Sequence, residues 1–213
     1  MHEAVPDHSV VEYPTSDGKP LAESDLHFDR LTYAAHALKV RYADTPDVYV
    51  GANMLVYDEP GNPRRHLAPD VFVVFGVPNR RRDLFKIWEE KPPSFVLEVT
   101  SKSTRREDMR TKRQRYAAWG VQEYFLYDPR SEYLAPPFQG LTLRQGMYQS
   151  MQLTRFPNGR HGYASQVLGI HLYLKGSELR LFDPAAGHDL RTHEEAEREI
   201  AELRAQIRGL TGE

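Results

Sequence analysis

The fold is decided by two short apolar segments, Pro69-Asp70-Val71-Phe72-Val73-Val74-Phe75 and Ser94-Phe95-Val96-Leu97-Glu98-Val99-Thr100. Each is rich in β-branched and aromatic residues and lies between Pro and Gly signals, which predicts a strand buried on both faces. Each also carries one carboxylate, Asp70 or Glu98. Because a buried ionised carboxylate must find a cation or become protonated, we expect the two acids to share a basic partner or a divalent metal ion.

The order of residues in these segments predicts that the two acids meet. Asp70 lies at the start of its strand, and Glu98 lies near the end of the next one. In antiparallel neighbours the start of one strand lies beside the end of the other, so both carboxylates reach one edge of the sheet. Two carboxylates, completed by water and a phosphate oxygen, form a ligand set that Mg²⁺ prefers and that Mn²⁺ also accepts.

A helix follows the second segment. Thr104 and Glu107 have the spacing of a capping box at its start, and Gly120 stands just past its end. The apolar run Glu123–Asp128 comes next and predicts another strand. A strand, a helix and a strand with this compact spacing predict a right-handed crossover and a parallel pair inside a mixed sheet.

Lys112 is the third element of the predicted site. It shares one helix face with Met109, Tyr116 and Trp119, at steps of three and four residues. The apolar members identify that face as buried, so Lys112 is expected to point toward the sheet and the two acids. The alternative is structural, because Asp108 lies four residues before Lys112 and can form a simple ion pair with it.

The rest of the chain is divided into an arm, a domain with further predicted helices and strands, and a C-terminal segment. Residues 1–20 are expected to form an N-terminal arm, and residues 21–187 a single α/β domain. Within the domain, the sequence predicts a helix over residues 24–43, a strand over 47–57, a long polar connection over 76–93 and a hairpin turning at residues 175–178. Two residues of the first helix, Glu23 and His27, lie on its inner stripe and are additional candidates for the site.

The C-terminal segment, residues 190–211, is expected to be a helix. Its apolar residues alternate in steps of four and three, which is the seam of a short coiled coil: Ala196, Ile200, Leu203, Ile207 and Leu210. The seam spans only about two heptads, so docking back onto the domain and pairing with a second subunit both remain open. Pairing, and hence a homodimer, is slightly favoured.

Composition excludes several classes of protein. With 213 residues, 40% hydrophobic residues and 27% charged residues, the chain is globular. It has no cysteine, which rules out disulfide scaffolds, thiolate metal sites and cysteine nucleophiles. Motifs for nucleotide binding, zinc binding and serine hydrolases are missing. Neither a secretory signal nor an apolar run of membrane-spanning length occurs, so we expect a cytoplasmic protein with no membrane partner.

Positive charge is concentrated after the second strand, although the net charge is −2. Between residues 102 and 115 seven basic residues face only two acidic ones. Such a basic face suits phosphate binding, although charge runs are often only solvated helix faces. The candidates for phosphate contacts are Arg105, Arg106, Arg110 and Arg113.

Four blocks of the sequence resemble the Uma-type restriction endonuclease family, which belongs to the nuclease superfamily named for its Pro-Asp…(Asp/Glu)-x-Lys motif. The resemblance covers roughly residues 20 to 185. Its blocks are Ala68-Pro69-Asp70-Val71, Pro93 to Thr104, Asp108…Lys112…Tyr116, and Gly120 to Pro129.

The resemblance implies a restriction-endonuclease-like fold, a mixed β-sheet flanked by helices, with Asp70 and Glu98 as metal-binding acids. The sequence departs from the motif at Thr100, where the superfamily places its lysine. Related families move that lysine to the following helix, which matches Lys112. Lys102 is the competing candidate, although it would need a bend in the chain to reach the acids.

These expectations combine into a functional hypothesis with two alternatives. The preferred function is a Mg²⁺-dependent DNA endonuclease that hydrolyses phosphodiester bonds through a metal-activated water, with Asp70, Glu98 and Lys112 as catalytic residues. The first alternative is a catalytically inactive nucleic-acid-binding module of the same fold. The second is an interaction protein that acts through its C-terminal helix and has no salt-dependent affinity for DNA.

Overall fold

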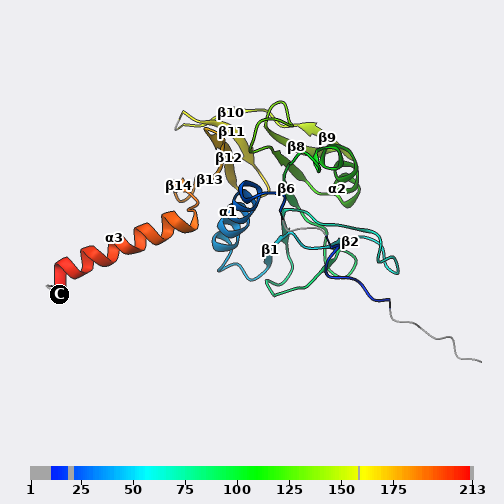
Figure 1. Cartoon of the computed structure of the whole chain (residues 1–213), viewed down its shortest axis with the longest axis horizontal. Coiled ribbons are helices and arrows are strands. Elements are labelled where there is room, and N and C mark those ends of the chain that lie inside the picture. Colours follow the sequence, from blue (N-terminus) through cyan, green and yellow to red (C-terminus); the bar gives the residue numbers. More distant parts are fainter. Residues whose placement is uncertain (1–10, 19–21, 158, 212–213) are drawn as a thin grey trace, which may run out of the picture.

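The computed structural model describes residues 11–18, 22–157 and 159–211, so residues 1–10 and 19–20 of the expected N-terminal arm lie outside the described residues. Its centre is a six-stranded mixed sheet with the strand order β1-β4-β6-β7-β8-β9 (Figure 1). Strands β6 and β7 are parallel, whereas the other neighbours are antiparallel. The strands are β1 (Val48–Ala52), β4 (Val71–Phe75), β6 (Phe95–Val99), β7 (Glu123–Tyr127), β8 (Phe138–Arg144) and β9 (Met147–Ser150).

Two further sheets accompany the central one. An antiparallel five-stranded sheet contains β10 (Thr154–Arg155), β11 (His161–Ser165), β12 (Ile170–Lys175), β13 (Glu178–Asp183) and β14 (His188–Asp189). The predicted hairpin is confirmed, because β12 and β13 pair up to Lys175 and Glu178. A three-stranded sheet has the order β3 (His66–Leu67), β2 (Val56–Tyr57) and β5 (Phe85–Lys86).

The helices pack around these sheets. They are α1 (Asp25–Arg41), the π-helix η1 (Glu107–Lys112), which continues directly into α2 (Arg113–Trp119), and α3 (His193–Thr211). Helix α1 lies between the central sheet and β13 (Figure 1). The predicted mixed α/β architecture, with helices flanking a mixed sheet and a helix at the C-terminus, is confirmed. None of the helices in the described part of the chain is long and apolar enough to cross a membrane.

A separate hydrophobic core covers each face of the central sheet, because successive strand residues point to opposite faces. In β6, Phe95, Leu97 and Val99 belong to the core shared with α1 and the five-stranded sheet. Val96 belongs to the other core, which includes residues of α2 such as Tyr116. The alternation therefore directs Glu98, two residues after Val96, toward the α2 side.

The predicted strand over residues 47–57 is broken in two. Asn53, between β1 and β2, has a φ of 44°, in the left-handed region that asparagine tolerates better than most residues. Its backbone N–H donates to the carbonyl oxygens of Pro69 and Asp70 at 3.0 and 3.1 Å. The chain thus leaves the central sheet next to Asp70, and β2 pairs in parallel with β5, which lies inside the polar connection over residues 76–93.

The start of the helical segment after β6 also differs from the prediction. The reciprocal cap joins Ser101 and Thr104 instead of Thr104 and Glu107: the Thr104 N–H donates to Ser101 Oγ at 3.2 Å, and the Ser101 N–H donates to Thr104 Oγ1 at 3.1 Å. The helical residues nevertheless begin at Arg105, directly after Thr104 as predicted, and a turn over residues 102–104 precedes them. Its predicted end is confirmed, since Gly120 follows with a φ of 81°.

Asp58 ties the end of α2 to the residues after β2. The Trp119 indole N–H donates to Asp58 Oδ2 at 2.7 Å, Arg115 Nη2 lies 2.9 Å from Oδ1, and the Asp58 side chain is only 5% exposed. Burial alone would raise the pKa of Asp58, but the hydrogen bonds from Trp119 and Arg115 outweigh it and hold that pKa below its ordinary value. Asp58 therefore stabilises the fold above the unfolded-state pKa, and this contribution is lost as the pH falls through the lowered one.

Replacing Asp58 by Asn is accordingly expected to lower the free energy of unfolding by about 1–3 kcal/mol at pH 7. The deficit should shrink as the pH is lowered toward 3, because the carboxylate of the wild-type protein then becomes protonated and its charge no longer stabilises the folded state. Urea denaturation across this pH range measures both quantities, with the substitution of the exposed Asp44 by Asn as the control. A deficit that is independent of pH would contradict the role of the charge.

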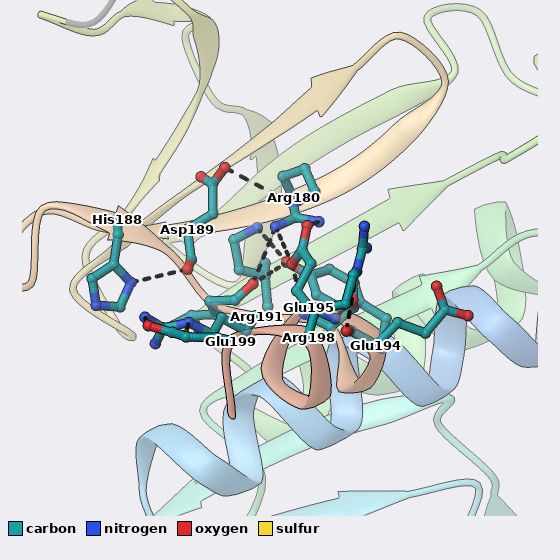
Figure 2. A network of polar contacts seen from close by, with 12 residues as sticks. Arg180, His188, Asp189, Arg191, Glu194, Glu195, Arg198 and Glu199 are labelled. Atoms are coloured by element: carbon teal, nitrogen blue, oxygen red, sulfur yellow. Dashed lines mark hydrogen bonds and ion pairs between the residues drawn. The ribbon is translucent and has the colours of Figure 1, made fainter. Parts of the chain in front are cut away.

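The contacts between α3 and the five-stranded sheet that the structure describes lie in the first turns of the helix. Arg180 of β13 donates to both carboxylate oxygens of Glu195, at 2.9 and 2.8 Å, while Thr192 and Glu195 form a reciprocal cap (Figure 2). Beyond this network α3 extends away from the sheets (Figure 1). Leu203 and Leu210 of the predicted seam are 51% and 88% exposed.

Candidate active site

Glu98 is the centre of a buried polar cluster on the α2 side of the central sheet. Its side chain is fully buried. Lys112 Nζ donates to Glu98 Oε2 at 2.8 Å, and the Tyr116 hydroxyl donates to Oε1 at 2.6 Å. Both partners of the Glu98 carboxylate thus come from the helical segment: Lys112 is the last residue of η1, and Tyr116 lies one turn later in α2.

Asp70 lies against the same strand. Its Oδ2 accepts the Val99 N–H at 2.7 Å, and its own N–H lies 3.4 Å from Glu98 Oε2. The antiparallel register of β4 and β6, which pairs Val71 with Leu97, produces this reciprocal contact. The structure therefore brings Asp70, Glu98 and Lys112 together at one sheet edge, as the sequence predicts.

A third carboxylate completes the cluster. Asp108 Oδ1 lies 3.0 Å from Lys112 Nζ, and its Oδ2 accepts the Thr104 hydroxyl at 2.8 Å. The Tyr124 hydroxyl fixes the same turn by donating to the Asp108 carbonyl oxygen at 2.9 Å. The ion pair between Lys112 and Asp108, which was the alternative to a functional role, is thus also present. Lys112 contacts both Glu98 of β6 and Asp108 of its own helical segment.

The π-helical turn explains why Asp108, and not Met109, shares the buried face with Lys112. A π-helix has a wider turn than an α-helix, so residues of η1 fall on different faces from those that α-helical spacing predicts. Met109, expected on the buried face, is instead 41% exposed, while Asp108 is buried. Such turns are frequent at functional sites.

The ionisable groups of the cluster have shifted pKa values. Burial raises the pKa of Glu98 well above its ordinary value, and the nearby charge of Lys112 only partly opposes this. Burial would also raise the pKa of Asp70, but the hydrogen bond from His27 and the charge of Lys112 lower it instead. Burial would lower the pKa of Lys112, yet the three surrounding carboxylates raise it, so the lysine is charged throughout the neutral pH range.

A pocket of about 200 Å³ opens beside these acids. His27 Nε2, at its wall, lies 3.5 Å from Asp70 Oδ2. Burial would lower the pKa of His27, but the hydrogen bond to Asp70 outweighs it and raises that pKa. The additional candidates Glu23, His27 and Lys102 all line this pocket, so the structure gathers them at one place next to the acids.

The four candidate arginines lie outside this pocket. Arg105, Arg106 and Arg110 are exposed and, together with Met109, line a separate hollow of about 410 Å³. Arg113 is half-buried and donates to the Tyr148 carbonyl oxygen at 3.0 Å. Since Arg110 and Arg113 also border a groove between α2 and the β8–β9 hairpin, the four arginines form a basic surface along the outer side of the helical segment.

The acidic and histidine side chains of the cluster limit which metal ion it could hold. Within residues 11–18, 22–157 and 159–211, no group of three or more His, Asp or Glu side chains is placed to hold an ion. Both oxygens of Glu98 already accept hydrogen bonds, whereas Asp70 Oδ1 accepts none from the described residues and the side chain is 13% exposed. This arrangement fits a Mg²⁺-type cation, which takes one or two carboxylates and completes its shell with water and substrate phosphate.

Two members of the cluster were not assigned to the site from the sequence. Tyr116, which contacts Glu98, was recognised as buried but not as polar support, although it lies four residues after Lys112. Thr104 was assigned to a cap, whereas its hydroxyl donates to Asp108. In both cases the signal is a polar group four residues from a charged one on the same helical segment.

Comparisons with known proteins place these residues in a family. No curated protein matches the chain. Among solved structures, a putative nuclease belonging to DUF820 from Anabaena variabilis resembles it with a TM-score of 0.43 and 13% identity, over 63% of this chain and 74% of that one. The model of the family described as "Putative restriction endonuclease" matches residues 2–172. The match spans most of the chain, which therefore belongs to the Uma2 family.

Proposed function

We propose that this member of the nuclease family is a divalent-metal-dependent DNA endonuclease that hydrolyses phosphodiester bonds. The observation that carries the proposal is the convergence of Asp70, Glu98 and Lys112 beside a pocket, with the Lys112 Nζ 2.8 Å from Glu98 Oε2. Burying two acids and a lysine together is costly, and hydrophobic residues of similar volume often stabilise a fold equally well. A functional role is therefore a better account of the cluster than stability.

Each residue of the cluster has a defined role in this proposal. Asp70 and Glu98 would hold Mg²⁺, or Mn²⁺ as a substitute, and such an ion polarises the phosphodiester and lowers the pKa of a bound water. Lys112 is held in its charged form, so it serves as a positive charge that orients Glu98 and stabilises the negative charge of the transition state, and not as a general base.

The basic surface formed by Arg105, Arg106, Arg110 and Arg113 supplies contacts to the DNA backbone. Contacts of this kind depend on salt concentration and carry no sequence information. Arg113 also donates to Tyr148, so its contribution is expected to be smaller than that of the exposed Arg105 and Arg110.

Incubation of the purified protein with supercoiled plasmid tests the activity. Nicked or linear products are expected with Mg²⁺ or Mn²⁺ and not with EDTA. Salt-dependent DNA binding without cleavage under any divalent ion would instead support the binding module, and the loss of both would support an interaction protein. A titration with labelled duplex at several salt concentrations supplies the binding measurement.

We also propose that α3 pairs with α3 of a second copy in a parallel coiled coil. From Ile200 to Leu210 its seam places isoleucine at the first core position of each heptad and leucine at the second, which favours two parallel strands. Parallel pairing brings Glu199 opposite Arg204 of the partner subunit, a favourable charge pair. The exposure of Ile200 and Leu203, 39% and 51%, leaves these positions accessible for pairing.

Replacing Leu203 by Glu is expected to weaken dimerisation about a hundredfold or more, because a leucine is lost from the core on both strands and two like charges face each other. Sedimentation equilibrium over a range of protein concentrations measures the change. The matched control is Ala205→Glu, which adds the same charge on the solvent side of the helix. A monomeric wild-type protein, or equal weakening by both variants, would contradict the pairing.

A further inference from the structure

The pocket beside the acids is closed on one side by a loop that follows β7. Asp128, which is 1% exposed, organises this loop: its Oδ1 accepts the Arg130 N–H at 3.0 Å, and its Oδ2 accepts the N–H groups of Tyr133 and Leu134. Three backbone hydrogen bonds to one buried carboxylate fix the loop in place. Arg130 and Tyr133 are therefore presented to the pocket on a rigid support.

The topology brings this loop opposite the residues after β6. Because β6 and β7 are parallel, their C-terminal ends lie at the same edge, where ligands commonly bind in α/β sheets. The Thr100 N–H donates to the Tyr127 carbonyl oxygen at 2.7 Å and joins the two ends. Lys102 lies two residues after Thr100, so an exposed lysine and the exposed Arg130 stand on two sides of the pocket.

The wall of the pocket holds an unsatisfied hydroxyl. Thr100 is 2% exposed, lines the pocket, and its Oγ1 has no hydrogen-bond partner among the described residues. Nδ1 of His27, at the same wall, is also without one. Burying an unpaired hydroxyl destabilises a protein, so buried polar groups are normally satisfied. These atoms indicate a ligand that accepts hydrogen bonds.

We propose that this pocket is a phosphate subsite for the nucleic-acid strand, in which Lys102 and Arg130 bind the phosphate oxygens and the Thr100 hydroxyl donates to the same group. Its volume of about 200 Å³ is below that of usual small-molecule pockets and suits a backbone phosphate with part of its sugar. Two cations face one carboxylate, Glu23, at the rim. Tyr133 offers an aromatic surface beside the phosphate, suited to stacking. The assignment rests on the proposed nuclease function.

Binding of a labelled DNA duplex in EDTA tests the subsite without cleavage. Lys102→Ala and Arg130→Ala are each expected to raise Kd about tenfold and to reduce the slope of log Kd against log salt concentration by about one. The controls Lys175→Ala and Arg155→Ala, which remove exposed cations from the five-stranded sheet, should leave Kd within about twofold. Equal effects of the two sets of variants would overturn the subsite.

Thr100→Val provides an independent test, because it removes only the hydroxyl. The unfolding temperature should rise by about 2–4 °C, since an unpaired buried hydroxyl is replaced by a methyl group. Affinity for the duplex should fall several-fold at the same time. A lower unfolding temperature or an unchanged affinity would show that the hydroxyl does not serve a ligand.

The results separate this inference from the nuclease proposal. If the Lys102 and Arg130 variants bind and cut like wild type while Asp70→Asn abolishes cutting, the subsite is wrong and the nuclease stands. If the wild-type protein never cuts but Arg130→Ala loses duplex affinity and salt dependence, the nuclease is wrong and the phosphate subsite stands.

Discussion

Replacing Lys112 by Met is expected to lower the free energy of unfolding by about 3–5 kcal/mol at pH 7. Lys112 is 7% exposed, and its Nζ lies 2.8 Å from Glu98 and 3.0 Å from Asp108. Methionine keeps most of the length of the side chain, so little packing is lost. The loss arises because two buried carboxylates are left without their cation, and urea denaturation measures it.

The destabilisation should grow with pH. Without the lysine, the folded-state pKa values of both carboxylates lie above their unfolded values of about 4, so the folded state binds more protons and loses stability as the pH rises. We therefore expect a smaller deficit at pH 5 than at pH 8. Arg110→Met, which removes an exposed cation of the same helical segment, is the matched control and should show neither effect.

A double-mutant cycle attributes the loss to the pair. Adding Glu98→Gln to the Lys112→Met variant removes one of the two uncompensated charges, so it should recover about 1–2 kcal/mol, whereas Glu98→Gln alone should destabilise the wild-type protein. Additive effects of the two substitutions would show that Lys112 and Glu98 are not coupled. The loss of stability in Lys112→Met could then not be attributed to the ion pair.

Replacing Asp70 by Asn is expected to reduce plasmid cleavage at least about a hundredfold, because even the supporting partners of metal ligands cost 10–100-fold when they are changed. The substitution is nearly isosteric, and the Asn oxygen can still accept the Val99 N–H that Asp70 Oδ2 accepts at 2.7 Å. The fold should therefore survive, which circular dichroism and thermal unfolding verify.

The matched control for this variant is Asp58→Asn, which neutralises a hydrogen-bonded acid at the other end of the helical segment. It should cut at the wild-type rate at a temperature where it is folded. Undiminished cleavage by Asp70→Asn would assign the activity either to other residues or to a contaminating nuclease. Calorimetric titration with Mn²⁺ adds a second measurement, since Asp70→Asn should weaken binding of the ion even where no substrate is present.

Sequence patterns were sufficient to predict the centre of this structure. The two acid-bearing segments are short, apolar and bounded by turn signals, and their order along the chain places Asp70 beside the end of β6. Helical spacing also predicted that Lys112 points inward, where it meets Glu98. These predictions depend on local periodicity and on one pair of neighbouring strands.

Other features depend on contacts between distant residues. The π-helical turn, which exposes Met109, is supported by the contacts of Asp108 with Thr104, Lys112 and Tyr124, and spacing alone does not reveal these. The break at Asn53 is fixed by the carbonyl groups before β4. The pocket is lined by the loops that follow β6 and β7. The sequence predicts that these strands are parallel, but Arg130 lies at the pocket because the Asp128 carboxylate holds the loop after β7, and that contact is not visible in the spacing.

The position of Glu98 on β6 has a consequence for how such a protein can diversify. Strand β6 is hydrogen-bonded on both sides, to β4 and β7, and has a hydrophobic core against each face. Strands of this kind are the last part of a molecule to open, whereas loops tolerate replacement. Arg130 and Tyr133 stand on a loop, so mutations and insertions can change that side of the pocket while the strand that carries Glu98 keeps its structure.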